Sequence, residues 1–189
     1  MKIGLVRHGS TAWNQEGRAQ GSSDIPLDEE GKLGARKLAD RLAEERWDFI
    51  YASDLARAAQ TAEIIGEKIG VEVRQDPRLR EASGGLIEGT TEEERIEKWG
   101  PNWRELDLGI ERANVVVSRA LSIFKQIHQQ HKDMHVLIVS HGALIKHLLH
   151  ELQPDFQMVE ALRNNSLTIL QATEQGWKGD LYNCTNHLQ

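Results

Sequence analysis

Cationic, imidazole and carboxylate side chains follow the predicted strands of this chain closely. The sequence RHG at residues 7–9 follows the apolar run IGLV, and SHG at residues 140–142 completes the run HVLIVS. Arg57 lies in the first turn of a predicted helix after residues 48–52, and Glu81 follows the next short strand. Groups of this kind at strand ends indicate a binding or reactive site rather than packing.

Two arginines, two histidines and a glutamate are suited to a small oxyanion, and phosphate is the obvious candidate. The guanidinium of arginine offers paired donors in a plane that matches phosphate oxygens. Gly9 allows the backbone to approach an anion. Gly142 begins a helix whose positive end and free N–H groups are expected to face the same anion. A histidine ring can carry a covalent phosphoryl group, and a glutamate can give a proton to the leaving oxygen and take one from water.

The elements that must position these groups alternate between strand and helix. Buried strands are predicted at residues 3–7, 48–52, 71–74 and 135–140. Helices are predicted at 28–46, from the residues after Asp54 to about 69, at 90–99, at 111–131 and from 142 onward. Ser53 and Asp54 are expected to cap the helix that ends near residue 69. The runs SLTILQAT and WKGDLYNC predict a C-terminal hairpin around Gln175 and Gly176. This order predicts an α/β fold, a three-layer α/β/α sandwich with a mostly parallel sheet.

Ligands of an open parallel sheet bind just beyond the carboxyl ends of its strands. The reactive segments all follow such ends, so we expect their side chains to meet at one edge of the sheet. The groups expected there are Arg7, His8, Arg57, Glu81 and His141.

The bulk properties of the chain are those of an ordinary globular protein. Its 189 residues suit a single domain over 1–189, and a formal net charge of −6 argues against general binding to nucleic acid or to a membrane surface. The apolar run at the N-terminus is too short for a signal-peptide core or a membrane span. Because Cys184 is the single cysteine, no disulfide forms within the chain, and a cytoplasmic location is expected.

Five motifs, in this order, carry a resemblance to the histidine phosphatase superfamily in its phosphoglycerate-mutase-like branch. They are RHGST with Asn14, GRAQG at 17–21, SDLARAAQTA at 53–62, LRE at 79–81 and SHG at 140–142. RHG alone is a weak signal, whereas the ordered set is a strong one. The resemblance implies the sandwich fold, hydrolysis of phosphate esters through a phosphohistidine, and neither a metal nor another cofactor.

The same resemblance implies a role for each matching residue. His8 is the expected nucleophile, and Arg7 and Arg57 are expected to clamp the phosphoryl oxygens. Glu81 is expected to act as general acid and base, and His141 as a second phosphate ligand that is protonated when the anion is bound. Substrate contacts are expected from Asn14, Gln20, Gly21 and Gly142.

The stretch after Glu81 departs from the family pattern. Gly84 stands where related chains commonly have a large residue, and Ile87 stands where they have a tryptophan. Both differences remove bulk, so a roomier wall is expected beside the glutamate. Residues 82–110 are expected to form a small helical cap that sets the specificity. Arg112, which follows the cap, is interpreted as a surface residue rather than as a contact to a second charge on the substrate.

The other histidines are not expected to bind a metal. His128 and His131 are three residues apart on a predicted helix, and so are His147 and His150. No third ligand accompanies either pair. The arginines and histidines at the sheet edge already supply the positive charge that a metal ion would bring.

Three functions stay open on the sequence alone. The favoured one is a phosphomonoesterase that acts on a small phosphorylated metabolite. A phosphoglycerate mutase uses the same phosphohistidine, but the Glu-Arg-His-Tyr-Gly stretch typical of the cofactor-dependent mutases is absent. A catalytically silent phosphate-binding scaffold is disfavoured by the complete set of reactive residues. The sequence names neither the ester nor the oligomeric state.

Overall fold

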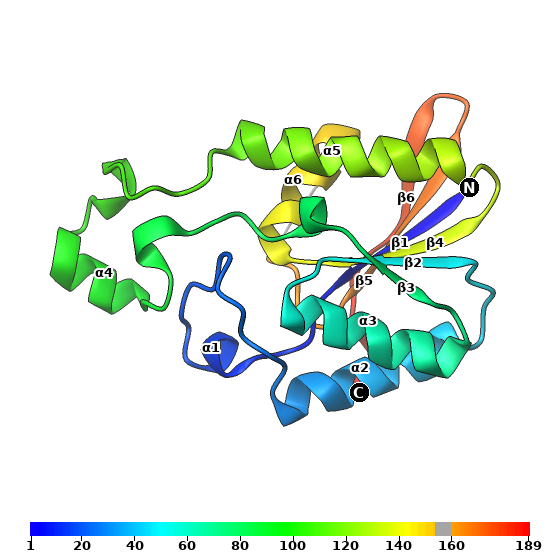
Figure 1. The fold of residues 1–189 in the computed structure, drawn as a ribbon, viewed down its shortest axis with the longest axis horizontal. Helices are drawn as coiled ribbons and strands as arrows, with labels where there is room; N and C mark the ends of the chain where they lie inside the picture. The colour runs from blue at the N-terminus through cyan, green and yellow to red at the C-terminus, as the bar shows by residue number, and fades with distance from the viewer. Residues whose placement is uncertain (154–159) are drawn as a thin grey trace.

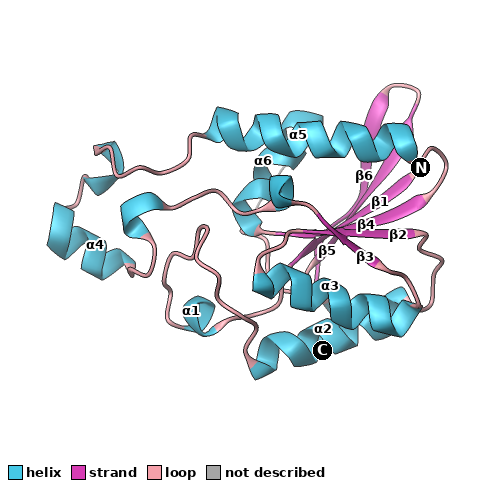
Figure 2. Ribbon diagram, in the orientation of Figure 1, coloured by secondary structure: helices cyan, strands magenta, loops and turns pink. Residues whose placement is uncertain are grey.

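The computed structural model describes residues 1–153 and 160–189, which form a six-stranded sheet with helices on both faces (Figure 1, Figure 2). The strands are β1 (Lys2–Arg7), β2 (Phe49–Ala52), β3 (Val73–Gln75), β4 (His135–Ser140), β5 (Leu167–Thr173) and β6 (Gly176–Cys184). Their spatial order is β3-β2-β4-β1-β5-β6. Neighbours among the first four are parallel, whereas β5 and β6 are antiparallel to the strands beside them. The predicted α/β/α sandwich with a C-terminal hairpin is confirmed.

Four longer helices pack in pairs on the two faces of the sheet. They are α2 (Glu29–Leu42), α3 (Ala56–Ile69), α5 (Ala113–Gln130) and α6 (Gly142–Leu152). α2 and α3 cover one face, and α5 and α6 cover the other (Figure 1). Successive residues of β4 alternate between the two apolar clusters, so Leu137 packs under α2 and α3 while Ile138 packs under α5 and α6. Because the central strands are buried on both faces, they read as continuous apolar runs in the sequence.

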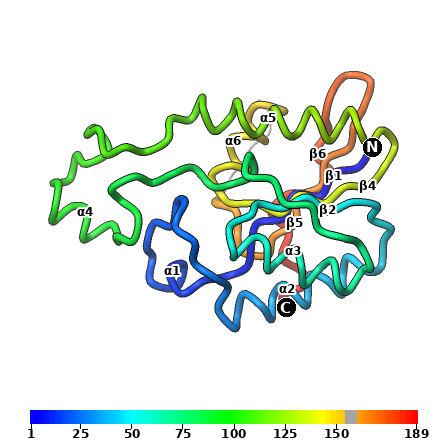
Figure 3. The backbone as a smooth tube through the Cα atoms, viewed as in Figure 1, coloured from blue at the N-terminus to red at the C-terminus, as the bar shows by residue number. Residues whose placement is uncertain are grey.

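Loops at the carboxyl ends of the parallel strands build one end of the molecule. The short elements there are α1 (Ala12–Gln15), α4 (Glu92–Trp99) and 3-10 turns at Pro77–Leu79, Gly85–Ile87 and Trp103–Glu105. A last 3-10 turn, Asn186–Leu188, lies near the C-terminus. Residues 82–110 project from the sheet beside the loop that carries α1 (Figure 3). Main-chain hydrogen bonds from Ala19 to Thr90 (3.0 Å) and from Gly89 to Ala19 (2.8 Å) join the two segments.

The start of α3 differs from the prediction. Ser53 and Asp54 were expected to cap the helix, but the capping position is Leu55, whose side chain makes no cap hydrogen bond. The N–H of Ala56 donates instead to the carboxylate of Asp24, at 2.6 Å, from a loop far away in the sequence. A carboxylate from another segment thus satisfies the first turn, which no local capping pattern could indicate.

Other boundaries are displaced by a few residues, the starts of α4 and α5 by two each. α2 ends at Leu42 rather than at residue 46. β3 begins at Val73 rather than at Val71, because Gly70 adopts a left-handed conformation (φ 72°) that ends α3. The N–H of Val71 then bonds back to the carbonyl of Gly66 at 3.1 Å, as is usual after a glycine helix terminus. Within the described part of the chain, no helix is both long and apolar enough to cross a membrane.

Candidate active site

The loops after β1 and β4 lie side by side because the two strands are parallel neighbours. Their register pairs Arg7 with Ser140, so His8 and His141 stand next to each other at the end of the sheet. The main-chain N–H of His8 donates to the carbonyl of Ser140 at 2.9 Å, and the two imidazole centroids are 5.1 Å apart. Both side chains are buried, with 2% of His8 and none of His141 exposed. The structure therefore brings the two predicted histidines together.

His8 is held in one tautomer. Its Nδ1 lies 2.7 Å from the carbonyl oxygen of Gly9, which can only accept, so Nδ1 carries the proton and Nε2 keeps a lone pair. Burial lowers the pKa of His8 well below 6.5, and the charges of Arg57 and Arg7 lower it further. The imidazole is therefore neutral at physiological pH, which is the state that a nucleophile needs.

His141 is buried without a partner for its ring. Neither Nδ1 nor Nε2 makes a hydrogen bond within residues 1–153 and 160–189. Burial, followed by the electrostatic effect of His8 and of the arginines Arg57, Arg7 and Arg119, lowers its pKa well below 6.5. A buried polar group without a partner is costly, and an anion beside it would supply the partner and favour the charged ring. The ring is thus suited to meet a negatively charged ligand.

Main-chain carbonyl groups hold the two arginines in place. Arg57, in the first turn of α3, donates from Nη1 to Ser23 and from Nη2 to Gly21, both at 2.7 Å. Burial lowers its pKa to about 10, so the guanidinium stays charged at neutral pH. Arg7 donates to the carbonyl of Leu162, and burial lowers its pKa as well. The Nε atoms of both arginines are buried and, among the described residues, unpaired, which leaves donors for phosphoryl oxygens.

Glu81 occupies the start of α6. Its Oε2 accepts the N–H of Ala143 at 3.0 Å, and its Oε1 accepts the N–H groups of Leu144 at 3.0 Å and Ala82 at 2.9 Å. The N–H groups that were expected to be free for an anion at this helix end are therefore partly occupied. Two of them hold the glutamate that is expected to act on the same ligand. Gly142 precedes them, and a side chain there would meet Arg7 only at an ordinary contact distance of 3.5 Å.

Gly9 has a packing reason for its lack of a side chain, in addition to the one expected. A Cβ at this position would lie 2.6 Å from the carbonyl oxygen of Gly31, in the first turn of α2. A Cβ on Gly31 would in turn lie 2.2 Å from the carbonyl oxygen of Ser10. The N–H of Gly9 donates to Thr61 on α3 at 3.0 Å. Close contact with α2 and α3 therefore fixes the loop that carries His8.

The predicted substrate contacts line the loop after β1. The Oδ1 of Asn14 accepts from Asn164 at 3.2 Å and from Thr11 at 3.2–3.3 Å, so its amide N–H groups are the end left for a ligand. The Oε1 of Gln20 accepts the hydroxyl of Thr11 at 2.9 Å. The carbonyl of Gly21 holds Arg57 rather than reaching outward. Sequence reasoning missed Asn164, whose side-chain amide also donates to the carbonyls of His8 (3.0 Å) and Gly9 (3.2 Å).

Glu88 explains the glycine at position 84. Its carboxylate accepts the N–H groups of Gly84 and Ser22, both at 2.8 Å, and the hydroxyl of Ser23 at 2.5 Å. Burial raises the pKa of Glu88, but these hydrogen bonds outweigh it and lower the pKa overall. A Cβ on Gly84 would lie 2.8 Å from the side chain of Glu88, so a large residue does not fit. Glu88 thus ties residues 82–110 to the loop whose carbonyls hold Arg57.

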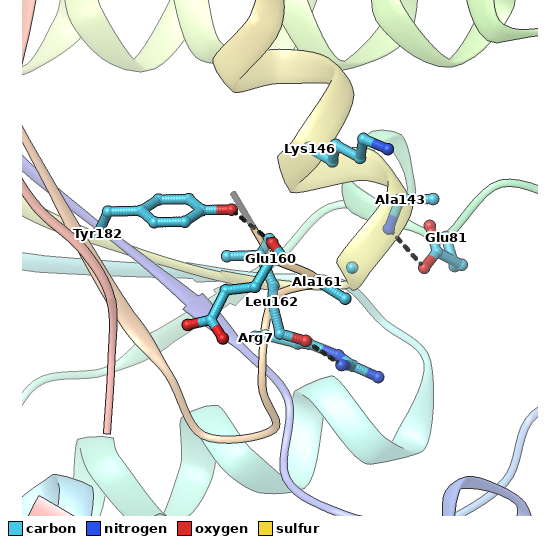
Figure 4. Close-up of a pocket in the computed structure, with 9 residues that line it drawn as sticks. Arg7, Glu81, Ala143, Lys146, Glu160, Ala161, Leu162 and Tyr182 are labelled. Atoms are coloured by element: carbon cyan, nitrogen blue, oxygen red, sulfur yellow. Dashed lines mark hydrogen bonds between the residues drawn. The ribbon is translucent and has the colours of Figure 1, made fainter. Parts of the chain in front are cut away.

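A cavity of about 500 Å³ opens beside this cluster. Its described lining is Arg7, Glu81, Gly142, Ala143, Lys146, Glu160, Ala161, Leu162 and Tyr182, most of which Figure 4 labels. Arg7 and Glu81 connect the cavity to the buried histidines, which do not belong to that lining. Lys146 is exposed on α6, one turn beyond Gly142, and Glu160 pairs with Arg163. No motif marks Lys146 or Glu160 in the sequence, so sequence reasoning missed this wall.

The remaining histidines have other surroundings. Nε2 of His131 lies 2.8 Å from the hydroxyl of Tyr51, and its ring stacks on Phe49 with centroids 3.9 Å apart. His128 packs edge-on against Trp177. Among the residues that the structure describes, no three His, Cys, Asp or Glu side chains are grouped as metal ligands. Arg112 lies exposed at the start of α5.

Comparison with known proteins agrees with this geometry. Residues 3–185 match the model of the histidine phosphatase superfamily (branch 1). The chain is 34% identical to "Uncharacterized phosphatase PhoE" of Bacillus subtilis, covering 97% of this chain and 95% of that protein. It is 32% identical to "Metal-independent phosphoserine phosphatase" of Arabidopsis thaliana, covering 99% and 83%. The solved structure of Bacillus stearothermophilus YhfR superposes with a TM-score of 0.89 at 30% identity, covering 100% and 99%. This chain belongs to the histidine phosphatase superfamily.

Proposed function

We propose that this protein is a metal-independent phosphomonoesterase that hydrolyses a small organic phosphate through a phosphohistidine at His8. Membership of the histidine phosphatase superfamily and the phosphatases among its relatives make it an enzyme of the phosphatase type. The observation that carries the mechanism is the fixed tautomer of His8, whose unprotonated Nε2 lies beside two arginines and an unpaired buried histidine. We take residues 1–189 as one catalytic domain that works in the cytoplasm.

The reaction proceeds in two transfers. Nε2 of His8 attacks phosphorus, the bond from phosphorus to the ester oxygen breaks, and Glu81 gives its proton to the leaving oxygen. A water molecule then attacks the phosphohistidine and passes its proton to Glu81, while the phosphorus–nitrogen bond breaks and releases phosphate. Arg7, Arg57 and His141 stabilise the charge on the phosphoryl oxygens in both transition states.

The substrate contacts belong to the same proposal. Asn14 and Gln20 face the phosphate from the loop after β1, while Gly21 keeps Arg57 oriented. Gly142 lets the phosphate lie against the start of α6. The cavity beside Arg7 and Glu81 receives the organic part of the ester, and its volume of about 500 Å³ suits a small metabolite.

Phosphate release from a panel of phosphomonoesters, measured with EDTA present, tests the proposal. Wild type is compared with His8→Ala and with His150→Ala, a control on the exposed face of α6. Release that survives EDTA and vanishes only in His8→Ala supports the phosphohistidine reaction. Release that persists in His8→Ala contradicts it.

Two further outcomes are informative. No release from any ester would overturn the phosphatase proposal. An assay for interconversion of phosphoglycerates, with added bisphosphoglycerate, would then detect a mutase that returns the phosphoryl group to its substrate. A loss of release on adding EDTA to wild type would instead show that a metal ion takes part.

A further inference from the structure

Arg119, on α5, uses every donor of its guanidinium on one short segment of the chain and on one carboxylate. Nη1 donates to the carbonyls of Arg78 (3.0 Å) and Arg80 (2.5 Å), and Nη2 donates to the carbonyl of Glu81 at 3.0 Å. Nε and Nη2 form a two-pronged pair with the carboxylate of Glu111, with both distances 2.9 Å. Arginine has five N–H groups, and these five contacts engage all of them.

Glu111 closes the base of residues 82–110. Its Oε2 accepts the N–H of Ser83 at 3.1 Å, and its own N–H donates to the carbonyl of Ser83 at 2.9 Å. The pair of Glu111 with Arg119 is largely shielded, since each side chain is 19% exposed. One charged pair therefore joins the two ends of this segment to the main chain that leads into Glu81.

Glu81 is consequently fixed from two helices. Its carboxylate lies on the N–H groups that open α6, and its carbonyl is bound by Arg119 on α5. Between β3 and residue 82 the chain forms only the 3-10 turn Pro77–Leu79, and the carbonyls of Arg78, Arg80 and Glu81 accept from Arg119. Arg119 thus holds the main chain from which the Glu81 side chain extends.

We infer that Arg119, together with Glu111, is a positioning residue that holds Glu81 at the distance from the leaving oxygen that proton transfer requires. The inference rests on the proposed function, in which Glu81 is the general acid and base. Displacement of a catalytic group by about 1 Å can cost about 100-fold in rate. A lysine at 119 offers three donors and no planar fork, so it cannot hold three carbonyls and a carboxylate at once.

Comparison of esters with different leaving groups distinguishes a positioning role of Arg119 from a general contribution to the stability of the fold. An alkyl phosphate needs a proton on its leaving oxygen, whereas 2,4-dinitrophenyl phosphate releases a stable anion without one. In Arg119→Ala, kcat for an alkyl phosphate is expected to fall by about 10- to 100-fold. The rate of the first-turnover burst of dinitrophenolate reports attack by His8 alone. In Arg119→Ala this rate is expected to change by less than about 3-fold, and the same is expected in Glu81→Gln.

A second variant and a control accompany this measurement. Glu111→Gln keeps the hydrogen-bonding shape but removes the charge, and it is expected to show the same difference between leaving groups at smaller size. Arg78→Ala removes an arginine that also joins this segment to α5, through Ser122 and Gln126, without touching Glu81. It is expected to leave both rates near wild type.

Equal losses for the alkyl ester and for the dinitrophenyl burst in Arg119→Ala would overturn the inference, and so would wild-type rates for both. If thermal unfolding shows that Arg119→Ala does not fold, Glu111→Gln decides by the same comparison. Failure of the proposed function is distinguishable, because His8→Ala would then retain both the burst and the turnover of the wild type.

Discussion

The stability of this protein is expected to depend on pH through His141. In the folded protein, burial and then the neighbouring cationic groups lower its pKa well below 6.5, whereas the unfolded chain keeps the ordinary value. As pH falls below 6.5, the unfolded chain therefore takes up a proton that the folded protein refuses. The contribution of His141 to the free energy of unfolding is fully present above that pH. It decreases as the pH falls, until the folded pKa is reached.

The size of the effect follows from the proton that the unfolded chain takes up and the folded protein does not. A group that stays neutral in the folded protein but has the ordinary pKa when unfolded loses on the order of 1 kcal/mol of stability between about pH 7.5 and about pH 5.5. With a urea dependence of about 1–3 kcal/mol per M, that loss lowers the unfolding midpoint by about 0.3–1 M. His8 is lowered in the same direction and adds a similar amount.

Urea unfolding of wild type, His141→Gln and the surface control His150→Gln at the two pH values measures how much of the pH dependence His141 causes. The glutamine at 141 removes the titration, so its midpoint is expected to fall less between the two pH values than that of wild type and of the control. Saturating inorganic phosphate is expected to flatten the wild-type dependence, because a bound anion favours the charged ring. Equal slopes for wild type and His141→Gln would refute the argument, since the ring would then carry its proton in the folded protein.

Three further changes have defined outcomes. Arg57→Lys loses the paired donors to the Gly21 and Ser23 carbonyls, and kcat/KM for phosphate release is expected to fall about 100-fold or more. Gly21→Ala, at φ 49° with a Cβ 2.2 Å from Glu88, is expected to lose about 1–3 kcal/mol in thermal unfolding. An equal loss in Gly17→Ala, where nothing lies within 4 Å, would exclude the Glu88 contact as the cause. Tyr51→Phe removes the hydrogen bond to His131 and is expected to cost about 1 kcal/mol in urea unfolding with phosphatase activity unchanged.

The pairing of His8 with His141 was predictable because it depends on strands alone. A strand buried on both faces reads as an unbroken apolar run, so the ends of β1 and β4 are visible in the sequence. Parallel neighbours then place the residues that follow those ends together, as the register of Arg7 with Ser140 shows. The same reasoning predicted at which edge of the sheet Glu81 lies. It could not predict which groups form hydrogen bonds with Glu81.

The groups that hold the site were not predictable, because each acts across a large separation in sequence. Glu88 is one of 29 acidic residues, and its binding to Ser22 and Ser23 depends on how residues 82–110 fold back. Asp24 caps α3 from another loop. Arg119 is one arginine on a long helix, and only the packing of α5 against the segment before Glu81 gives it a purpose. Propensity and periodicity carry no information on such contacts.

The start of α6 has a role that the motif SHG does not indicate. Two of its N–H groups, those of Ala143 and Leu144, are already occupied by Glu81, so this helix end mainly orders the proposed acid and base. Among the described residues of the site, the buried polar atoms without a partner lie instead on Arg7, Arg57 and His141. Because an unpaired buried group gains most from a new partner, these three side chains offer the larger stabilisation to a phosphoryl group. Loss of one of them should therefore weaken phosphate binding more than any change that leaves Glu81 on the helix.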